Sequence, residues 1–305
     1  MNRFHYAYAG LRVASEIELP EWAAFAQANP AGPPDVTISI GPVREDDLAA
    51  AENRRVITAD ECRFLVPAAG CFRVRNGSEI VVAPAPAAPL RRLCPWLTGT
   101  AWASLCYQRG LFLFHASALL VDRAAVLFCS RAKGGKSTIA AELNRRGYPL
   151  VSDDLCHIDI PAEGPPMLHP SVARLRLWVD ALGELGWSPE SLEPDHVRAG
   201  KFNVTRDVRR VGHASPVRAI YLLAWGELAI TRLEGVEGWR RFLPSATYRP
   251  KLLDSPEQLS RHTARSMAVL QRVPLWELRR PRDLAALKGV ADLLGNHWSE
   301  AGYNS

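Results

Sequence analysis

The sequence lacks several features that mark common classes of protein. None of its 6 cysteines forms a C-x-x-C pair, so we expect no zinc site and reduced core cysteines in a cytoplasmic protein. The most apolar stretch, 111–121, contains a histidine and is too short to cross a bilayer as a helix. The first ten residues contain no apolar signal-peptide segment, so neither export nor a membrane partner is expected.

Dense runs of basic residues are also missing. The formal net charge of +5 is spread thinly along the 305 residues. Arginine pairs at 145–146 and 240–241 do not make the continuous basic face that is typical of a nucleic-acid-binding protein. We therefore expect no nucleic-acid partner, although the positive charge suits a protein that handles phosphates. The apolar content is high enough for a large core.

The first third of the chain has the pattern of short strands separated by turns. Three β-branched or alternating segments are predicted to be strands: 36–40, 72–75 and 79–82. Asn76-Gly77 between the last two predicts a hairpin, and the Pro/Ala-rich segment 83–89 is typical of a linker. The sequence therefore predicts a smaller β-rich N-terminal domain, 1–88, and a larger domain, 89–305.

From Leu90 onward the pattern becomes that of an α/β protein. The segments predicted there are a helix at 92–109, strands at 113–121 and 124–129, a helix from 137 to about 146, strand residues at 151 and 155–160, a strand pair at 218–224 and 227–232, and helices at 256–272 and 283–295. Strand, glycine-rich loop, helix and strand in succession is the arrangement of a nucleotide-binding sheet.

The loop before the helix predicted from 137 to about 146 is a candidate phosphate-binding loop. Its residues, with the first helical threonine, are Ser130, Arg131, Ala132, Lys133, Gly134, Gly135, Lys136, Ser137 and Thr138. They match the pattern G-x-x-x-x-G-K-[ST], except that a serine stands at the first glycine. The glycines let backbone N–H groups face phosphates, the lysine supplies a cation, and the serine hydroxyl suits Mg²⁺. The alternative is a Gly-Gly turn that begins an ordinary helix.

Two carboxylates and a histidine flank this loop in the sequence. Asp153 and Asp154 end a predicted strand, with Asp154 18 residues after Lys136. One carboxylate of such a pair can organise Mg²⁺ and the other can accept the proton of an attacking hydroxyl. The alternative is a solvated strand end. His115 lies in an apolar strand, where a histidine is more often a core residue than a catalytic one.

Together, these residues resemble the catalytic domain of HPr serine kinase/phosphorylase. That family has a histidine that opens a strand, a loop lysine 21 residues later and an Asp-Asp pair 18 residues beyond it, as here. The resemblance implies a P-loop HPr-kinase-like core that uses ATP and Mg²⁺. It implies Asp154 as the base for a seryl hydroxyl, His115 beside the transferred phosphate, and Ser137 with Asp153 as metal ligands. Hexamers occur in that family, so it also implies a homo-oligomer.

The stretch 169–178, together with Lys201 and Arg249, resembles the HPr-kinase-like proteins of lasso-peptide biosynthesis. In that group the acceptor is the C-terminal serine of a precursor peptide, so such a peptide is the expected partner. Lys201 and Arg249 would contact the γ-phosphate or the peptide carboxylate. The alternatives are an HPr-type serine kinase, a small-molecule kinase or ATPase, and a catalytically inactive nucleotide-binding module. Ser130 and the lack of the family's downstream acidic metal ligand favour the last.

Overall fold

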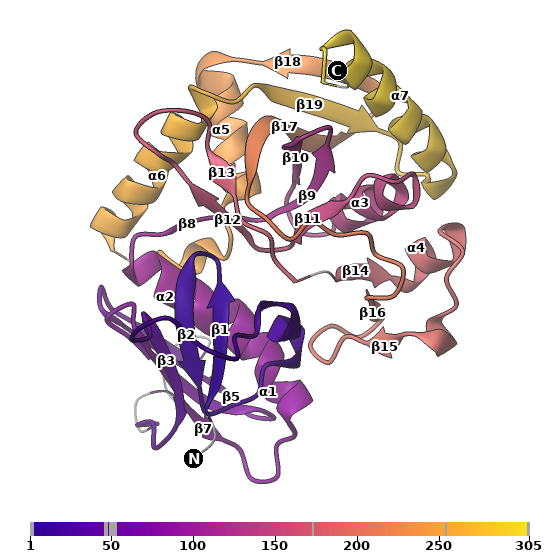
Figure 1. The fold of residues 1–305 in the computed structure, drawn as a ribbon. Coiled ribbons are helices and arrows are strands. Elements are labelled where there is room, and N and C mark those ends of the chain that lie inside the picture. The colour runs from indigo at the N-terminus through magenta and orange to yellow at the C-terminus, as the bar shows by residue number, and fades with distance from the viewer. Residues whose placement is uncertain (1–2, 46–47, 49–53, 173, 254, 304–305) are drawn as a thin grey trace. The chain divides into compact units, whose positions relative to one another are not determined.

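The computed structural model of the chain describes residues 3–45, 48, 54–172, 174–253 and 255–303. It is a mixed α/β protein with several sheets (Figure 1). The chain divides into two compact units, one formed by residues 1–113 and 249–262 and the other by residues 114–248 and 263–305.

The first unit is built around a sheet that has seven strands in the described residues. Their order is β1-β2-β3-β7-β6-β5-β4. The bounds are β1 Phe4–Tyr8, β2 Leu11–Ser15, β3 Val36–Ile40, β4 Arg55–Ile57, β5 Glu61–Val66, β6 Gly70–Arg75 and β7 Glu79–Pro84. The strands predicted at 36–40, 72–75 and 79–82 are therefore confirmed. β6 and β7 pair antiparallel, and Asn76 (φ 53°) and Gly77 (φ 60°) form the left-handed turn between them, which confirms the hairpin.

The first unit also contains several helical segments. They comprise η1 Pro20–Phe25, α1 Leu90–Trp96, the π-helical turn η3 Leu97–Ala101, α2 Trp102–Gln108 and η5 Pro250–Leu252. The helix predicted at 92–109 is thus present, with a π-helical turn in its middle. The side chain of Gln108 accepts a hydrogen bond from the backbone N–H of Gly77 at 2.9 Å, and the Trp102 ring packs edge-on against Trp22. These contacts place α2 in the first unit. The domain boundary between 88 and 89 stays a prediction.

The second unit contains a sheet of nine strands among the described residues. The strand order is β11-β9-β10-β17-β13-β12-β8, with β19 beside β17 and β18 beside β19. The bounds are β8 Phe112–Phe114, which spans the division between the units, β9 Ala116–Val121, β10 Ala124–Cys129, β11 Leu150–Asp153, β12 Cys156–Asp159, β13 Met167–Leu168, β17 Ser215–Trp225, β18 Ala229–Leu233 and β19 Leu275–Arg280. β9 is antiparallel to both β10 and β11, whereas β10, β17 and β19 are mutually parallel.

Two features of this sheet differ from the sequence prediction. The predicted strand 113–121 is interrupted at His115, which lies between β8 and β9. The strands predicted as a pair at 218–224 and 227–232 both form, as β17 and β18, but they do not pair with each other. β19 lies between them, parallel to β17 and antiparallel to β18. Three of the six residues of β19 are charged, so its sequence pattern did not indicate a strand in the interior of a sheet.

Helices pack on both faces of the second sheet. The helices after β10 are α3 Lys136–Arg145, α4 Val179–Glu184, α5 Gly235–Ala246, α6 Pro256–Leu270, which spans the division between the units, and α7 Leu287–Glu300, with short 3₁₀ turns η4 Pro189–Ser191 and η6 Leu284–Ala286. Apolar residues of α3 and α7 form the main core with β9, β10 and β17. At this core Trp298 Nε1 donates a hydrogen bond to Tyr221 Oη at 3.0 Å. α5 packs on β10 and β17, on the side away from α3 in Figure 1. The helices predicted at 137–146, 256–272 and 283–295 are confirmed within a few residues.

A small third sheet supplies one wall of the site described below. Its order is β14-β16-β15, with β14 Leu175–Trp178, β15 Glu193–Pro194 and β16 Lys201–Val204. β14 and β16 are antiparallel, and their register pairs Trp178 with Lys201. Arg176 and Trp178 are two residues apart in β14, so they project from the same face of the strand.

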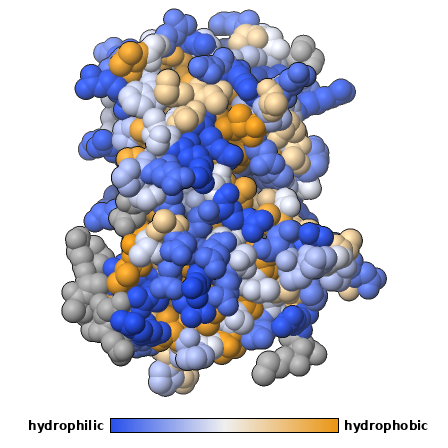
Figure 2. Space-filling view, turned by 90° about the vertical axis from the view of Figure 1, so that its left-hand side faces the viewer, coloured by the Kyte–Doolittle hydropathy of each residue, from blue (hydrophilic) through white to orange (hydrophobic). Residues whose placement is uncertain are grey.

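Hydrophilic side chains cover most of the face shown in Figure 2, where apolar ones lie scattered among them. Scattered exposed apolar residues are normal on a folded protein. Within the described residues, no helix combines the length and the hydropathy that a membrane crossing requires.

Candidate functional site

The predicted phosphate loop connects β10 to α3. Position 135 is the N-cap of α3 and has a left-handed φ of 77°, a conformation that glycine adopts without steric cost. At position 134 a Cβ atom would overlap the side chain of Ser130, so only glycine fits there. Lys133 has a left-handed φ of 66° although it is not glycine. The loop therefore has the tight, helix-starting geometry that the sequence predicted, with some backbone strain at Lys133.

All nine residues from 130 to 138 line one cavity of about 950 Å³ within the second unit. His115, Asp154 and Lys201, which the sequence also predicted, line the same cavity. Two lining residues carry carboxylates, Asp154 and Asp180, whereas eight are cationic: Arg131, Lys133, Lys136, Arg176, Arg198, Lys201, Arg280 and Arg282. This excess of positive charge, at the N-terminus of a helix, suits a polyanion such as a triphosphate.

Lys136, His115 and Asp154 form a chain of polar contacts at the centre of the cavity. The Lys136 ammonium lies 3.0 Å from His115 Nε2 and donates to the Ser130 carbonyl at 3.1 Å. Burial, and then the charge of Lys136, lowers the pKa of His115 to about 3, so this ring is neutral at pH 7. Because the ammonium can only donate, Nε2 must accept and the ring proton must be on Nδ1.

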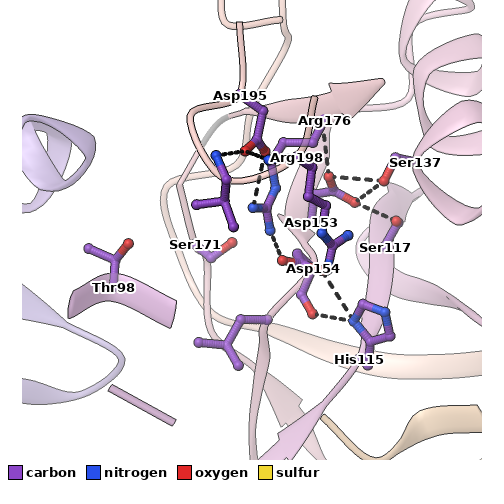
Figure 3. A network of polar contacts seen from close by, with 12 residues as sticks. Thr98, His115, Ser117, Ser137, Asp153, Asp154, Ser171, Arg176, Asp195 and Arg198 are labelled. Atoms are coloured by element: carbon purple, nitrogen blue, oxygen red, sulfur yellow. Dashed lines mark hydrogen bonds and ion pairs between the residues drawn. The ribbon is translucent and has the colours of Figure 1, made fainter. Parts of the chain in front are cut away.

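The protonated Nδ1 of His115 therefore points to Asp154. It lies 3.1 Å from the Asp154 carbonyl oxygen and 3.2 Å from Oδ1 (Figure 3). His115 thus connects the lysine of the loop to the candidate base. Burial lowers the pKa of Lys136, and the nearby Asp153 carboxylate opposes that shift.

The two adjacent aspartates have separate partners. Asp153 Oδ1 accepts hydrogen bonds from Ser117 Oγ at 2.5 Å and from Ser137 Oγ at 3.0 Å (Figure 3). Ser137 and Asp153 are hard oxygen donors beside the phosphate loop, so they fit Mg²⁺. Among the described residues there is no cluster of three or more His, Cys, Asp or Glu side chains that could hold a metal. A metal here would therefore also need oxygens from phosphates and water.

Asp154 lies outside the end of β11 in a strained conformation. Its φ is 75°, and the N–H of Leu155 donates to the Asp153 carbonyl at 3.0 Å, which closes a tight γ-turn around it. The carboxylate forms an ion pair with Arg176, whose guanidinium also lies 3.5 Å from Asp195. Left-handed non-glycine residues often occur at functional sites. The turn separates the side chain of Asp154 from that of Asp153 and directs it into the cavity.

The wall made by the third sheet carries an aromatic ring, Trp178, that lies near two lysines. The Lys201 and Lys133 ammonium groups lie 5.2 and 5.6 Å from the centroid of the Trp178 ring. Burial, and then the neighbouring charges of Arg198 and Arg176, lowers the pKa of Lys201 to about 8. A bound anion would favour the charged form of this lysine. The wall can therefore bind a negatively charged group beside the phosphate loop.

Most of the predicted site residues thus meet in one place within the second unit. Arg249 belongs to the first unit, and its role remains a prediction. Sequence reasoning missed several residues of the site: Ser117, Arg176, Trp178, Arg198, Trp225, Arg280 and Arg282. Ser117 lies two residues after His115 in the chain. Within the strand predicted at 113–121 the two residues would share a face, so this spacing could have indicated Ser117. The arginines from β14, β19 and the loops have no local pattern that would have indicated them.

Comparison with known proteins gives limited information. No protein-family model matches the chain, and no curated protein matches it. One similar solved structure is the Hpr(Ser) kinase/phosphatase from Coxiella burnetii, with 15% identity and a TM-score of 0.35. The similarity covers 62% of this chain and 98% of that chain. Values at this level establish neither a family for this chain nor a role for any of its residues.

Proposed function

We propose that the chain is an ATP-dependent kinase that transfers a phosphoryl group to the seryl hydroxyl of a peptide. The observation that supports this most directly is that Lys136, His115 and Asp154 form one contact chain inside a strongly cationic cavity. That arrangement brings a cation for the phosphates and a candidate base to the same place. Charge stabilisation and alignment dominate catalysis of phosphoryl transfer, and both are available here.

In the proposed reaction the acceptor oxygen forms a bond to the γ-phosphorus as the bond from that phosphorus to the β,γ-bridging oxygen breaks. Lys136 stabilises the negative charge on the transferring group. Asp154 accepts the hydroxyl proton, while His115, through its Nδ1 proton, keeps the carboxylate in position. Ser137 and Asp153 would hold Mg²⁺, which neutralises phosphate charge when it is bound.

The acceptor that we propose is the C-terminal serine of a precursor peptide of the lasso-peptide type. Such a serine carries a carboxylate beside its hydroxyl, and the cationic wall around Lys201 and Trp178 suits that group. An HPr-type protein acceptor remains the alternative substrate.

The test is phosphoryl transfer from Mg-ATP to matched peptides, followed by mass spectrometry of phosphoserine. One peptide ends in a free serine, the second has the same sequence with an amidated end, and the third has an internal serine. We expect transfer to the first and much less to the other two. Lys136→Met is the inactive control. Equal transfer to all three would contradict the C-terminal acceptor, and no phosphoserine on any would contradict the kinase.

A second candidate is a nucleotide-binding module that does not transfer the phosphoryl group. The observation in its favour is that both carboxylate oxygens of Asp154 already have partners, His115 at Oδ1 and Arg176 at Oδ2. Calorimetry separates the two functions, because the module would bind Mg-ATP tightly without phosphorylating a peptide or a protein acceptor.

A further inference from the structure

Arg280, the last residue of β19, lies against the phosphate loop although 146 residues separate it from Gly134. Its Nη2 donates a hydrogen bond to the Gly134 carbonyl at 2.9 Å. A Cβ atom at Gly135 would overlap the same guanidinium. The left-handed φ therefore favours glycine at position 135, and any other residue there would have to displace the guanidinium of Arg280.

This contact fixes the orientation of one peptide group of the loop. The structure contains no cis peptide bond among the described residues, so the C=O of Gly134 and the N–H of Gly135 point in opposite directions. Because the guanidinium holds the carbonyl on its own side, the N–H of Gly135 is directed away from Arg280. A phosphate loop binds anions through such N–H groups, and a carbonyl turned toward the anion would repel it.

The charge of Arg280 is buried without an opposite charge. The residue is only 4% exposed, and it makes no ion pair within the described parts of the chain. Its Nε also has no hydrogen-bond partner among the described residues. Burial lowers the pKa of Arg280 to about 10, so the side chain is still charged at pH 7. An uncompensated buried cation is costly, and a bound anion in the cavity would offset that cost.

The aromatic ring of Trp225 supports the guanidinium from β17. Arg280 lies 4.2 Å from the centroid of that ring, and both residues line the cavity. A cation packed on a tryptophan face keeps its planar donors in a fixed orientation. Strand pairing reinforces this, because Trp225 and Arg280 are partners in the register of β17 and β19.

We infer that Arg280 is a positioning residue of the phosphate loop, which orients the Gly134–Gly135 peptide and supplies a buried counter-charge for a bound polyphosphate. This inference rests on the proposed function in one respect: it takes a nucleoside triphosphate as the ligand of the cavity, and it does not require phosphoryl transfer. It assigns a role to a residue that the loop sequence does not contain, and it gives a structural reason for glycine at 135.

The experiment measures Mg-ATP affinity by calorimetry, without any acceptor, in Arg280→Met, Arg280→Lys and Arg279→Met. Methionine keeps an apolar stem and removes the charge and the hydrogen bond, and lysine keeps the charge but lacks the planar guanidinium. Arg279 is the matched control because it precedes Arg280 in β19, lies on the opposite face and is 45% exposed at its side chain. We expect the Kd to rise about 10- to 100-fold in Arg280→Met, less in Arg280→Lys, and less than about twofold in Arg279→Met.

The thermal midpoint without nucleotide separates positioning from a merely structural role. Removal of an uncompensated charge should leave the midpoint of Arg280→Met equal to or above that of the wild type. Wild-type affinity in Arg280→Met, or an equal loss in Arg279→Met, would overturn the inference. Should Arg280→Met not fold, wild-type affinity in Arg280→Lys would overturn it. A protein that binds ATP through Arg280 but phosphorylates nothing would refute the proposed function and leave this inference standing.

Discussion

Replacing Asp154 with asparagine tests whether its carboxylate acts as the base, because the side chain keeps its shape and place. Asparagine has nearly the same size, and its side-chain oxygen can still accept the Nδ1 proton of His115. The change removes the base and the ion pair with Arg176, which keeps Asp195 as a neighbour at 3.5 Å. General-base catalysis contributes about 100- to 10,000-fold, so we expect kcat for the serine-ended peptide to fall by that factor.

The affinity for Mg-ATP, unlike kcat, should not fall in Asp154→Asn. The Asp154 carboxylate pairs with His115 and Arg176 rather than with the candidate metal ligands, and its replacement takes one negative charge out of the cavity. The Kd for Mg-ATP in Asp154→Asn should therefore equal the wild-type value or lie below it. Calorimetry with ATP and Mg²⁺ measures this, and quenched-flow or discontinuous detection of phosphopeptide measures kcat.

The matched control is Asp180→Asn, because Asp180 is the other carboxylate that lines the cavity. Its Oδ1 accepts the N–H of Ala181 at 2.8 Å, within its own helix, and the residue is exposed. We expect its kcat to stay within about twofold of the wild type. A wild-type kcat in Asp154→Asn would remove Asp154 from the base role. A parallel rise in the Kd for Mg-ATP would show instead that the residue acts in nucleotide binding.

Three further predictions concern the metal, the acceptor and the core. Ser137→Ala removes one of two adjacent oxygen donors, so the gain in ATP affinity that Mg²⁺ gives should fall about 10- to 100-fold, measured by calorimetry with and without a chelator. Lys201 has a pKa of about 8 and binds an anion only when charged, so the KM for a free-acid peptide should rise as pH increases above that value. That rise should be absent in Lys201→Met, and its persistence there would remove Lys201 from the acceptor site. Tyr221→Phe leaves Trp298 Nε1 unpaired in the core, so it should lower the free energy of unfolding by about 1 to 3 kcal/mol. Urea denaturation measures this, and an unchanged midpoint would show that the hydrogen bond contributes nothing to stability.

Local elements of the fold were predictable because local sequence decides them. Asn76-Gly77 can adopt the two left-handed conformations of a hairpin turn at little cost, and the turn forms as predicted. The glycines at 134 and 135, placed between an apolar strand and an amphipathic helix, predict the loop before α3 for the same reason. The arrangement of β17, β18 and β19 was not predictable in this way, because a distant segment inserts between two strands that are neighbours in the chain.

In the candidate site, too, some features were predictable from local sequence and others were not. The sequence predicted the loop around Lys136 and the strand end at Asp153-Asp154, because each follows from an element of a few residues and its ends. It placed His115 inside one strand, where the structure has a break between β8 and β9. It could not predict that Asp153 and Asp154 would take different partners. That separation depends on the left-handed turn at Asp154 and on the hydroxyls of Ser117 and Ser137, which come from other elements.

The sequence by itself therefore determined the chemistry of the centre: a helix-starting loop with a lysine, a serine, two carboxylates and a histidine at set distances along the chain. Only the tertiary structure decided what surrounds that centre. Arg176, Trp225 and Arg280 reach the cavity from strands far apart in the chain, and their positions follow from strand pairing and burial rather than from any local pattern. Long-range packing is the physical reason, since the conformation of a short segment carries no information about which distant segment it will meet.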